Sequence, residues 1–128
     1  MKKELEDKLI KEFPKIFQDT EKPPNQSNMA FGCECGDGWF GIIQFLCRML
    51  QNSTDRENQP QIVASQIKEK FGELRFYVNS SSDKQNEMIL YTETLSHYVC
   101  ESCGTTNNVE TLNINNWLST RCKECLEK

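Results

Sequence analysis

The spacing of apolar and polar residues changes several times along the chain, and each change predicts a new element. Near the N-terminus, apolar residues such as Leu5, Leu9 and Phe13 recur every three or four positions among charged ones. This period is typical of an amphipathic helix. Pro14 lies inside the pattern and is expected to kink or restart that helix. The polar run over residues 18–30 predicts a loop.

Two further helices are predicted from the same period. A glycine-rich stretch precedes an apolar stripe over 38–51, and Asp37 is the expected N-cap of that helix. Ser82 and Gln85 match a capping box, which predicts a helix from there to about residue 98. The apolar side of this last helix is expected to consist of Met88, Tyr91, Thr92, Leu95 and Val99.

Residues 62–79 have the pattern of a β-hairpin that turns over 70–73. Leu74, Phe76 and Val78 alternate with polar residues, so one face of the second strand is expected to be buried. Nearer the C-terminus, apolar residues over 109–114 predict a second, smaller hairpin. We expect Trp117 and Leu118 to pack beside it, against the cysteine pairs described next.

Two cysteine pairs near the C-terminus carry the strongest chemical signal. Cys100 and Cys103 have two residues between them, as do Cys122 and Cys125, and eighteen residues separate the pairs. Four thiolates at this spacing are typical of a structural zinc site, because each short gap lets a backbone knuckle aim two sulfurs at one ion. The alternatives are two disulfides or four free thiols. A site with four protein ligands leaves no position open for a substrate.

Together these elements predict an α+β fold with three helices, a β-hairpin and a C-terminal four-cysteine zinc ribbon. The expected boundary lies between an α+β core over 1–98 and the ribbon over 99–128. The length of 128 residues fits this division, and 37% hydrophobic residues are enough for one core. Seven cysteines without a secretory signal or membrane-length apolar run lead us to expect a reducing compartment, the cytoplasm.

The remaining cysteines and the single histidine offer weaker candidates. Cys33 and Cys35 would point the same way on a strand, and they could start a second metal site with Cys47 or His97. No fourth ligand is evident, so we interpret these cysteines as small core residues. His97 comes at a predicted helix end, which favours a surface or capping role.

Catalysis and nucleic-acid binding each have one candidate cluster. Glu34, Asp37 and His97 would form an acid–base site only if the fold brought them into one pocket. Lys68, Lys70 and Arg75 lie among aromatic residues in the first hairpin, as in some single-strand binders. The formal net charge of −4 opposes nucleic-acid binding, which needs a positive surface.

Three blocks of the sequence resemble a family of small, mostly uncharacterised proteins encoded by phages and prophages. The blocks are Phe31-Gly-Cys-Glu-Cys-Gly-Asp-Gly-Trp-Phe40, Gln66-Ile-Lys-Glu-Lys-Phe-Gly-Glu-Leu-Arg-Phe-Tyr77, and the paired knuckles with Trp117-Leu118. The family usually has a second glycine after Gly72, where this chain has Glu73. The resemblance implies an origin in a mobile element and a zinc-bearing α+β domain, and it supplies no catalytic residues.

From this resemblance and the acidic charge we expect a non-enzymatic protein that binds a protein of the host cell. Inhibition of an antiviral defence system is the expected outcome, as in anti-CRISPR proteins that inhibit RNA-guided nucleases. Such nucleases present basic channels, which would attract an acidic partner. The alternative is a nucleic-acid-binding zinc ribbon that acts in phage transcription or replication.

Overall fold

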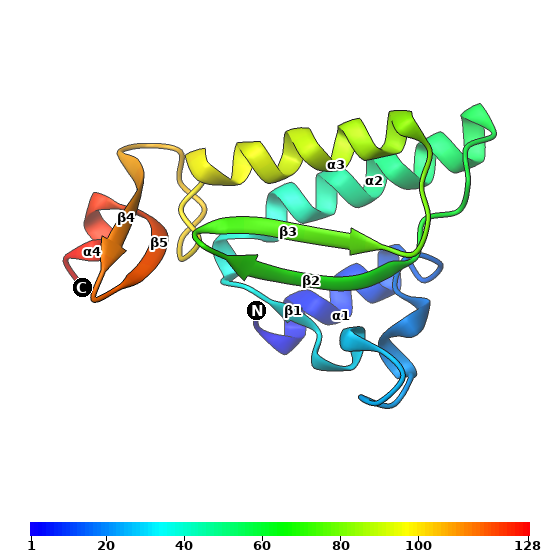
Figure 1. Ribbon diagram of the computed structural model, residues 1–128, viewed down its shortest axis with the longest axis horizontal. Coiled ribbons are helices and arrows are strands. Elements are labelled where there is room, and N and C mark those ends of the chain that lie inside the picture. The colour runs from blue at the N-terminus through cyan, green and yellow to red at the C-terminus, as the bar shows by residue number, and fades with distance from the viewer.

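The computed structural model describes all 128 residues and has a mixed α+β architecture (Figure 1). The four α-helices are α1 (Lys3–Glu12), α2 (Phe40–Glu57), α3 (Asp83–Leu95) and the short α4 (Lys123–Leu126). The five strands are β1 (Cys33–Glu34), β2 (Ala64–Lys70), β3 (Glu73–Val78), β4 (Val109–Ile114) and β5 (Trp117–Cys122). Single turns of 3-10 helix are η1 (Gln18–Glu21), η2 (Asn28–Phe31), η3 (Asp37–Trp39) and η4 (Ser96–Tyr98). The α+β class is confirmed, but the expected count of three helices is wrong because α4 adds a fourth.

The larger sheet has the order β1-β2-β3, and the smaller one is the β4-β5 hairpin. Strands β2 and β3 are antiparallel and turn at Phe71 and Gly72, whose φ angles of 55° and 80° are both left-handed. A turn with two successive left-handed residues has a backbone twist that matches that of the paired strands. The predicted hairpin is therefore confirmed. The two-residue strand β1, which pairs parallel with β2, was not predicted.

Helices α1, α2 and α3 enclose one hydrophobic core with the larger sheet. Helices α2 and α3 run side by side above the β2–β3 hairpin, as Figure 1 shows. The end of α1 contacts α2 through an ion pair between Glu12 and Arg48. Trp39, Leu46 and Ile67 are fully buried in this core. None of the helices combines the length and the apolar composition that crossing a bilayer requires.

Helix α3 also protects the free edge of the larger sheet. The backbone N–H of Leu74 donates to the Ser96 hydroxyl at 3.0 Å, and that of Phe76 donates to the Glu93 carboxylate at 2.8 Å. These N–H groups point away from β2 and would otherwise lack a partner in the sheet. Desolvation by burial raises the pKa of Glu93 in spite of this hydrogen bond. The edge of β3 is thus closed by side chains.

Some of the predicted helix boundaries and caps are wrong. Helix α2 continues to Glu57 rather than 51, and it ends at Asn58, which adopts a left-handed φ of 57°. Asp37 does not cap it, because its carboxylate instead accepts the backbone N–H of Lys2 at 2.7 Å. The capping box of Ser82 and Gln85 is confirmed at the start of α3.

Two predictions of burial are wrong. Tyr91 and Leu95 were expected in the core but are 71% and 47% exposed on the outer side of α3. Trp117 was expected to pack against the knuckles but is 66% exposed at the tip of the β4–β5 hairpin, and Leu118 is also exposed. The helix and the hairpin therefore both present apolar side chains to solvent.

Candidate metal centre

Each cysteine pair forms a knuckle in which a backbone amide points at a sulfur. The N–H of Cys103 donates to Cys100 Sγ at 3.5 Å, and the N–H of Cys125 donates to Cys122 Sγ at 3.4 Å. The first knuckle follows η4 and closes through Gly104, whose φ of 82° is accessible mainly to glycine. The second joins the end of β5 to α4. Two separate segments thus present equivalent pairs of sulfurs.

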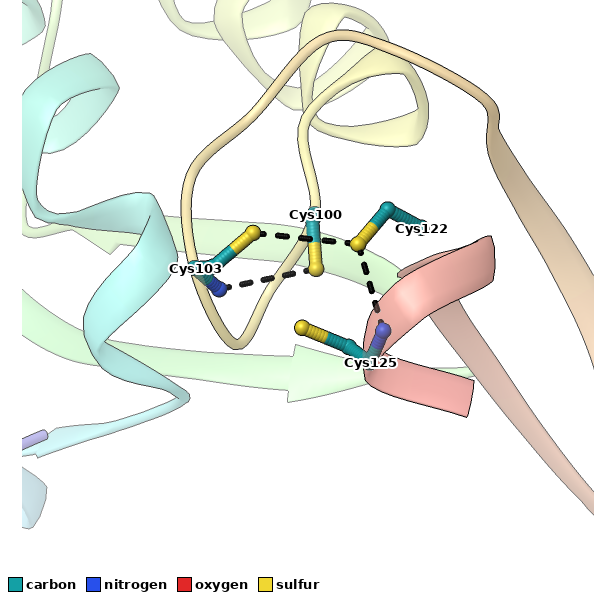
Figure 2. Close-up of side chains that lie close together, drawn as sticks. All are labelled: Cys100, Cys103, Cys122 and Cys125. Carbon is teal, nitrogen blue, oxygen red and sulfur yellow. Dashed lines mark hydrogen bonds between the residues drawn. The ribbon is translucent and has the colours of Figure 1, made fainter. Parts of the chain in front are cut away.

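The four sulfurs lie close enough to bind one metal ion. All four are within 4.8 Å of one another, and Cys103 Sγ and Cys122 Sγ are 3.8 Å apart (Figure 2). A tetrahedral ion with metal–sulfur bonds of about 2.3 Å separates its sulfurs by about 3.8 Å. A disulfide would need about 2.05 Å. The arrangement therefore fits a shared ion, and all seven cysteines are free thiols.

The sulfurs of the cluster differ in their affinity for protons. Burial raises the pKa of the Cys100 thiol, but hydrogen bonds from the backbone of Cys103, Cys122 and Ser102 outweigh it and lower the pKa to about 6. The pKa of Cys125 is raised to about 12, mainly by a hydrogen bond with Cys122 and to a lesser extent by desolvation. Metal-free sulfurs so close together do not all ionise. A bound cation would displace the remaining protons and make every sulfur a thiolate ligand.

The first knuckle docks on the glycine-rich turn that precedes α2. The N–H of Gly38 donates to the Glu101 carbonyl at 2.8 Å, and the N–H of Gly36 donates to the Glu101 carboxylate at 2.9 Å. A Cβ atom at Gly38 would lie 2.1 Å from the carbonyl oxygen of Cys100, closer than packed atoms tolerate. The indole N–H of Trp39 also donates to the Val99 carbonyl at 2.9 Å. These contacts place the metal cluster beside the core.

A second set of polar contacts joins the β2–β3 turn to the β4–β5 hairpin. His97 Nε2 lies 2.7 Å from a Glu73 carboxylate oxygen, and its Nδ1 lies 2.9 Å from the Thr111 hydroxyl. The Thr111 hydroxyl is 2.6 Å from that of Thr120, which in turn donates to the Gly72 carbonyl. His97 therefore links two hairpins and is not part of the metal cluster, which consists of cysteines alone.

The other three cysteines lie in the hydrophobic core. Cys33, Cys35 and Cys47 are all less than a tenth exposed. Desolvation raises the pKa of each thiol, to about 12 for Cys33. The C-terminal cluster is the one place where three or more potential metal ligands come together. The interpretation of these cysteines as core residues is confirmed by their burial.

The three residues considered for acid–base chemistry have separate partners. Asp37 bonds with the Lys2 backbone, Glu34 lies in β1 opposite Lys68, and His97 pairs with Glu73. None of the five main clefts is lined by any two of the three. The structure does not assemble them into one site.

Sequence reasoning missed a cleft between the tips of the two hairpins. Its volume is about 470 Å³, and the exposed rings of Phe71 and Trp117 line it from opposite hairpins. Lys70 Nζ lies 5.6 Å from the centre of the Phe71 ring. The other residues that line it are Glu69, Asn113, Asn116 and Leu118. The sequence did contain one indication of the exposed residues. A two-stranded hairpin has too little covering structure to bury apolar residues at its tip, so Trp117 could have been expected to face solvent.

Comparison with protein-family models, with curated proteins and with solved structures finds no significant match to this chain. The function of this chain must therefore be inferred from its residues and their geometry, and the resemblance to phage-encoded proteins is a hypothesis from motifs.

Proposed function

We propose that this chain is a zinc-stabilised, non-enzymatic protein that binds another protein through the cleft between its two hairpins. Four sulfurs within 4.8 Å of one another support zinc, the metal that most often takes four thiolates in structural sites. A site filled by four protein ligands serves folding rather than chemistry. In this proposal, the ion fixes the β4–β5 hairpin and thereby holds Trp117 opposite the β2–β3 turn.

The observation that carries the proposal is the exposure of two large aromatic rings at one cleft. Phe71 is 67% exposed and Trp117 is 66% exposed, although burying them would be favourable. Exposed aromatic residues around a concavity are typical of protein interfaces, where they act as anchors for a partner's side chains. The mixed polar lining of Asn113, Asn116 and Glu69 would supply hydrogen bonds at the rim.

The proposed partner is a protein of the host cell with a basic surface. The formal net charge of −4 would speed its encounter with such a surface. An RNA-guided nuclease is the partner class that we propose first, because its channels for guide and target are basic. Binding there would block nucleic-acid access and so inhibit antiviral defence.

The metal is tested directly by elemental analysis and by cobalt substitution of the purified chain. We expect one zinc per chain, and a cobalt spectrum of a tetrahedral thiolate site. Material without a transition metal, or with the cluster sulfurs oxidised to disulfides, would refute this part of the proposal.

The partner is tested by affinity capture from bacterial lysate with three forms of the metal-loaded protein. Proteins bound by the unmodified chain should be lost with Trp117→Ala and retained with Phe31→Ala, whose ring is 59% exposed in η2. A purified guide-loaded nuclease should lose cleavage activity in the presence of the unmodified chain but not of Trp117→Ala. Capture of the same proteins by all three forms would contradict the proposed site. Capture of nucleic acid with a steep loss at high salt would instead favour the nucleic-acid alternative.

A further inference from the structure

Helix α3 carries large apolar side chains on two sides. Its inner side packs on α2 and the sheet, and includes the buried Ile89 and the partly buried Met88. Its outer side, continued into η4, exposes four more: Leu90 at 58%, Tyr91 at 71%, Leu95 at 47% and Tyr98 at 65%. We call these four residues the α3 stripe. No intramolecular packing explains them, and a contiguous exposed apolar surface marks an interaction site.

The stripe is contiguous because of helical geometry. Residues three, four and seven positions apart share one side of a helix, so Tyr91, Leu95 and Tyr98 lie along one line. Leu90 lies beside this line, and the exposed Thr94 lies between Leu90 and Tyr98 at four-residue steps from each. A small residue at the middle of a bulky stripe leaves room for another helix to approach within about 8–10 Å.

We propose that the α3 stripe binds the α3 stripe of a second copy, with the two helices antiparallel and a twofold axis at Thr94. Leu90 and Tyr98 are equally distant from Thr94 along the sequence. An antiparallel pair therefore sets Leu90 of each copy against Tyr98 of the other, and the same contact is made twice. Such a self-complementary surface is what a twofold interface requires.

The charges on the helix are compatible with this pairing. Two exposed acids on the outer side of α3, Asp83 and Glu87, precede the stripe. Between Leu90 and Tyr98 the one acidic residue is Glu93, which is buried. In the antiparallel pair, the two copies of Glu87 would be about 21 Å apart along the axis, at 1.5 Å per residue. This exceeds the screening length of about 8 Å at physiological salt. Repulsion between them is therefore small.

The area of the stripe suffices for a weak dimer. With roughly half to two-thirds of each side chain exposed, the four together offer on the order of 500 Å² per copy, or about 1,000 Å² per pair. This is near the lower limit for a specific interface. We therefore expect a weak dimer. The cleft between the hairpins is separate from the stripe, because Phe71 and Trp117 belong to other elements.

Sedimentation of the full-length, metal-loaded chain over a range of concentrations tests the proposal. We expect a reversible change from one-chain to two-chain mass. Thr94→Glu and Thr94→Lys place like charges together at the twofold axis, so each alone should weaken the dimer at least about tenfold. Mixing the two variants should restore a dimer, because opposite charges then meet at the axis.

Two controls separate this interface from other effects. Phe71→Ser changes an equally exposed ring outside the stripe and should leave the dimer unchanged. Tyr91→Ser should weaken the dimer while circular dichroism and metal content stay normal, since Tyr91 is not in the core. A one-chain mass at all concentrations would overturn the proposal. So would a dimer that both Thr94 variants leave intact, or a mixture of the two that stays monomeric.

Discussion

All 19 residues of the hydrophobic core lie between Leu9 and Val99, whereas residues 100–128 bury only two apolar side chains, Cys100 and Cys122, and both are potential metal ligands. The first region is thus stabilised by packing of apolar side chains. The second relies on its cysteine cluster, on backbone hydrogen bonds and on contacts with the first region. A segment of this size cannot enclose a core of its own and needs another source of stability. We therefore expect the two regions to respond differently to the same perturbations.

Metal removal should have the largest effect and should fall on the C-terminal region. Structural zinc contributes on the order of 10–16 kcal/mol to small modules. Chelation or Cys122→Ser is therefore expected to unfold residues 100–126, with rapid hydrogen exchange there and retained protection in α2. Cys33→Ala is the matched control, because it removes a buried thiol that is not in the cluster. Unchanged exchange in chelated Cys122→Ser would contradict the prediction.

A cavity in the core should destabilise the first region without releasing the metal. Leu46 is fully buried, so Leu46→Ala is expected to cost about 2–5 kcal/mol of the free energy of unfolding. Its exposed neighbour Phe45 provides the control, and Phe45→Ala should change stability by less than about 0.5 kcal/mol. Denaturant unfolding and metal content check both variants. Loss of metal from folded Leu46→Ala would show that the two regions are not separable.

The contact between the regions can be tested with two glycines of the same segment. Gly38→Ala forces a Cβ against the Cys100 carbonyl and should cost about 1–3 kcal/mol. Gly41 lies in α2 with no atom within 4 Å of a Cβ placed there, so Gly41→Ala should stabilise the helix by up to about 1 kcal/mol. Thermal melting of the two variants should shift in opposite directions. A shift in the same direction would argue against tight docking of the knuckle.

The smallest expected effect concerns Glu93 and pH. Burial raises its pKa in the folded state, so the folded protein holds this proton more tightly than the unfolded chain. Stability from this group is therefore greatest below the unfolded-state pKa of about 4.3 and falls as pH rises through the higher folded pKa. Glu93→Gln keeps an acceptor for Phe76 and should remove this slope in urea titrations at several pH values. An identical slope in the variant would refute the assignment.

The local features of this fold could be predicted from sequence because neighbouring residues determine them. The two-residue gaps between cysteines place the sulfurs of each knuckle, and the Ser82–Gln85 pair places the start of α3. The alternation in Leu74 and Phe76 indicates which face of β3 is buried. None of these depends on a distant segment.

The features that the sequence did not reveal depend on contacts across the chain. The glycines at 36 and 38 indicated a bend, but nothing in their neighbourhood identified Glu101 as the partner. Tyr91 and Leu95 have the spacing of core residues, yet α3 has apolar residues on two sides, and only the position of α2 and the sheet decides which are buried. The exposure of Trp117 could have been predicted from its place at a hairpin tip, but the cleft itself needs Phe71, which lies in a distant hairpin.

The side chains of Ser96 and Glu93 occupy the outward N–H groups of β3. A foreign strand would have to break both hydrogen bonds before it could extend this sheet, so fibril growth and β-strand addition are disfavoured at that edge. A partner that binds this face of the molecule would therefore have to contact side chains, because main-chain pairing on β3 is already blocked.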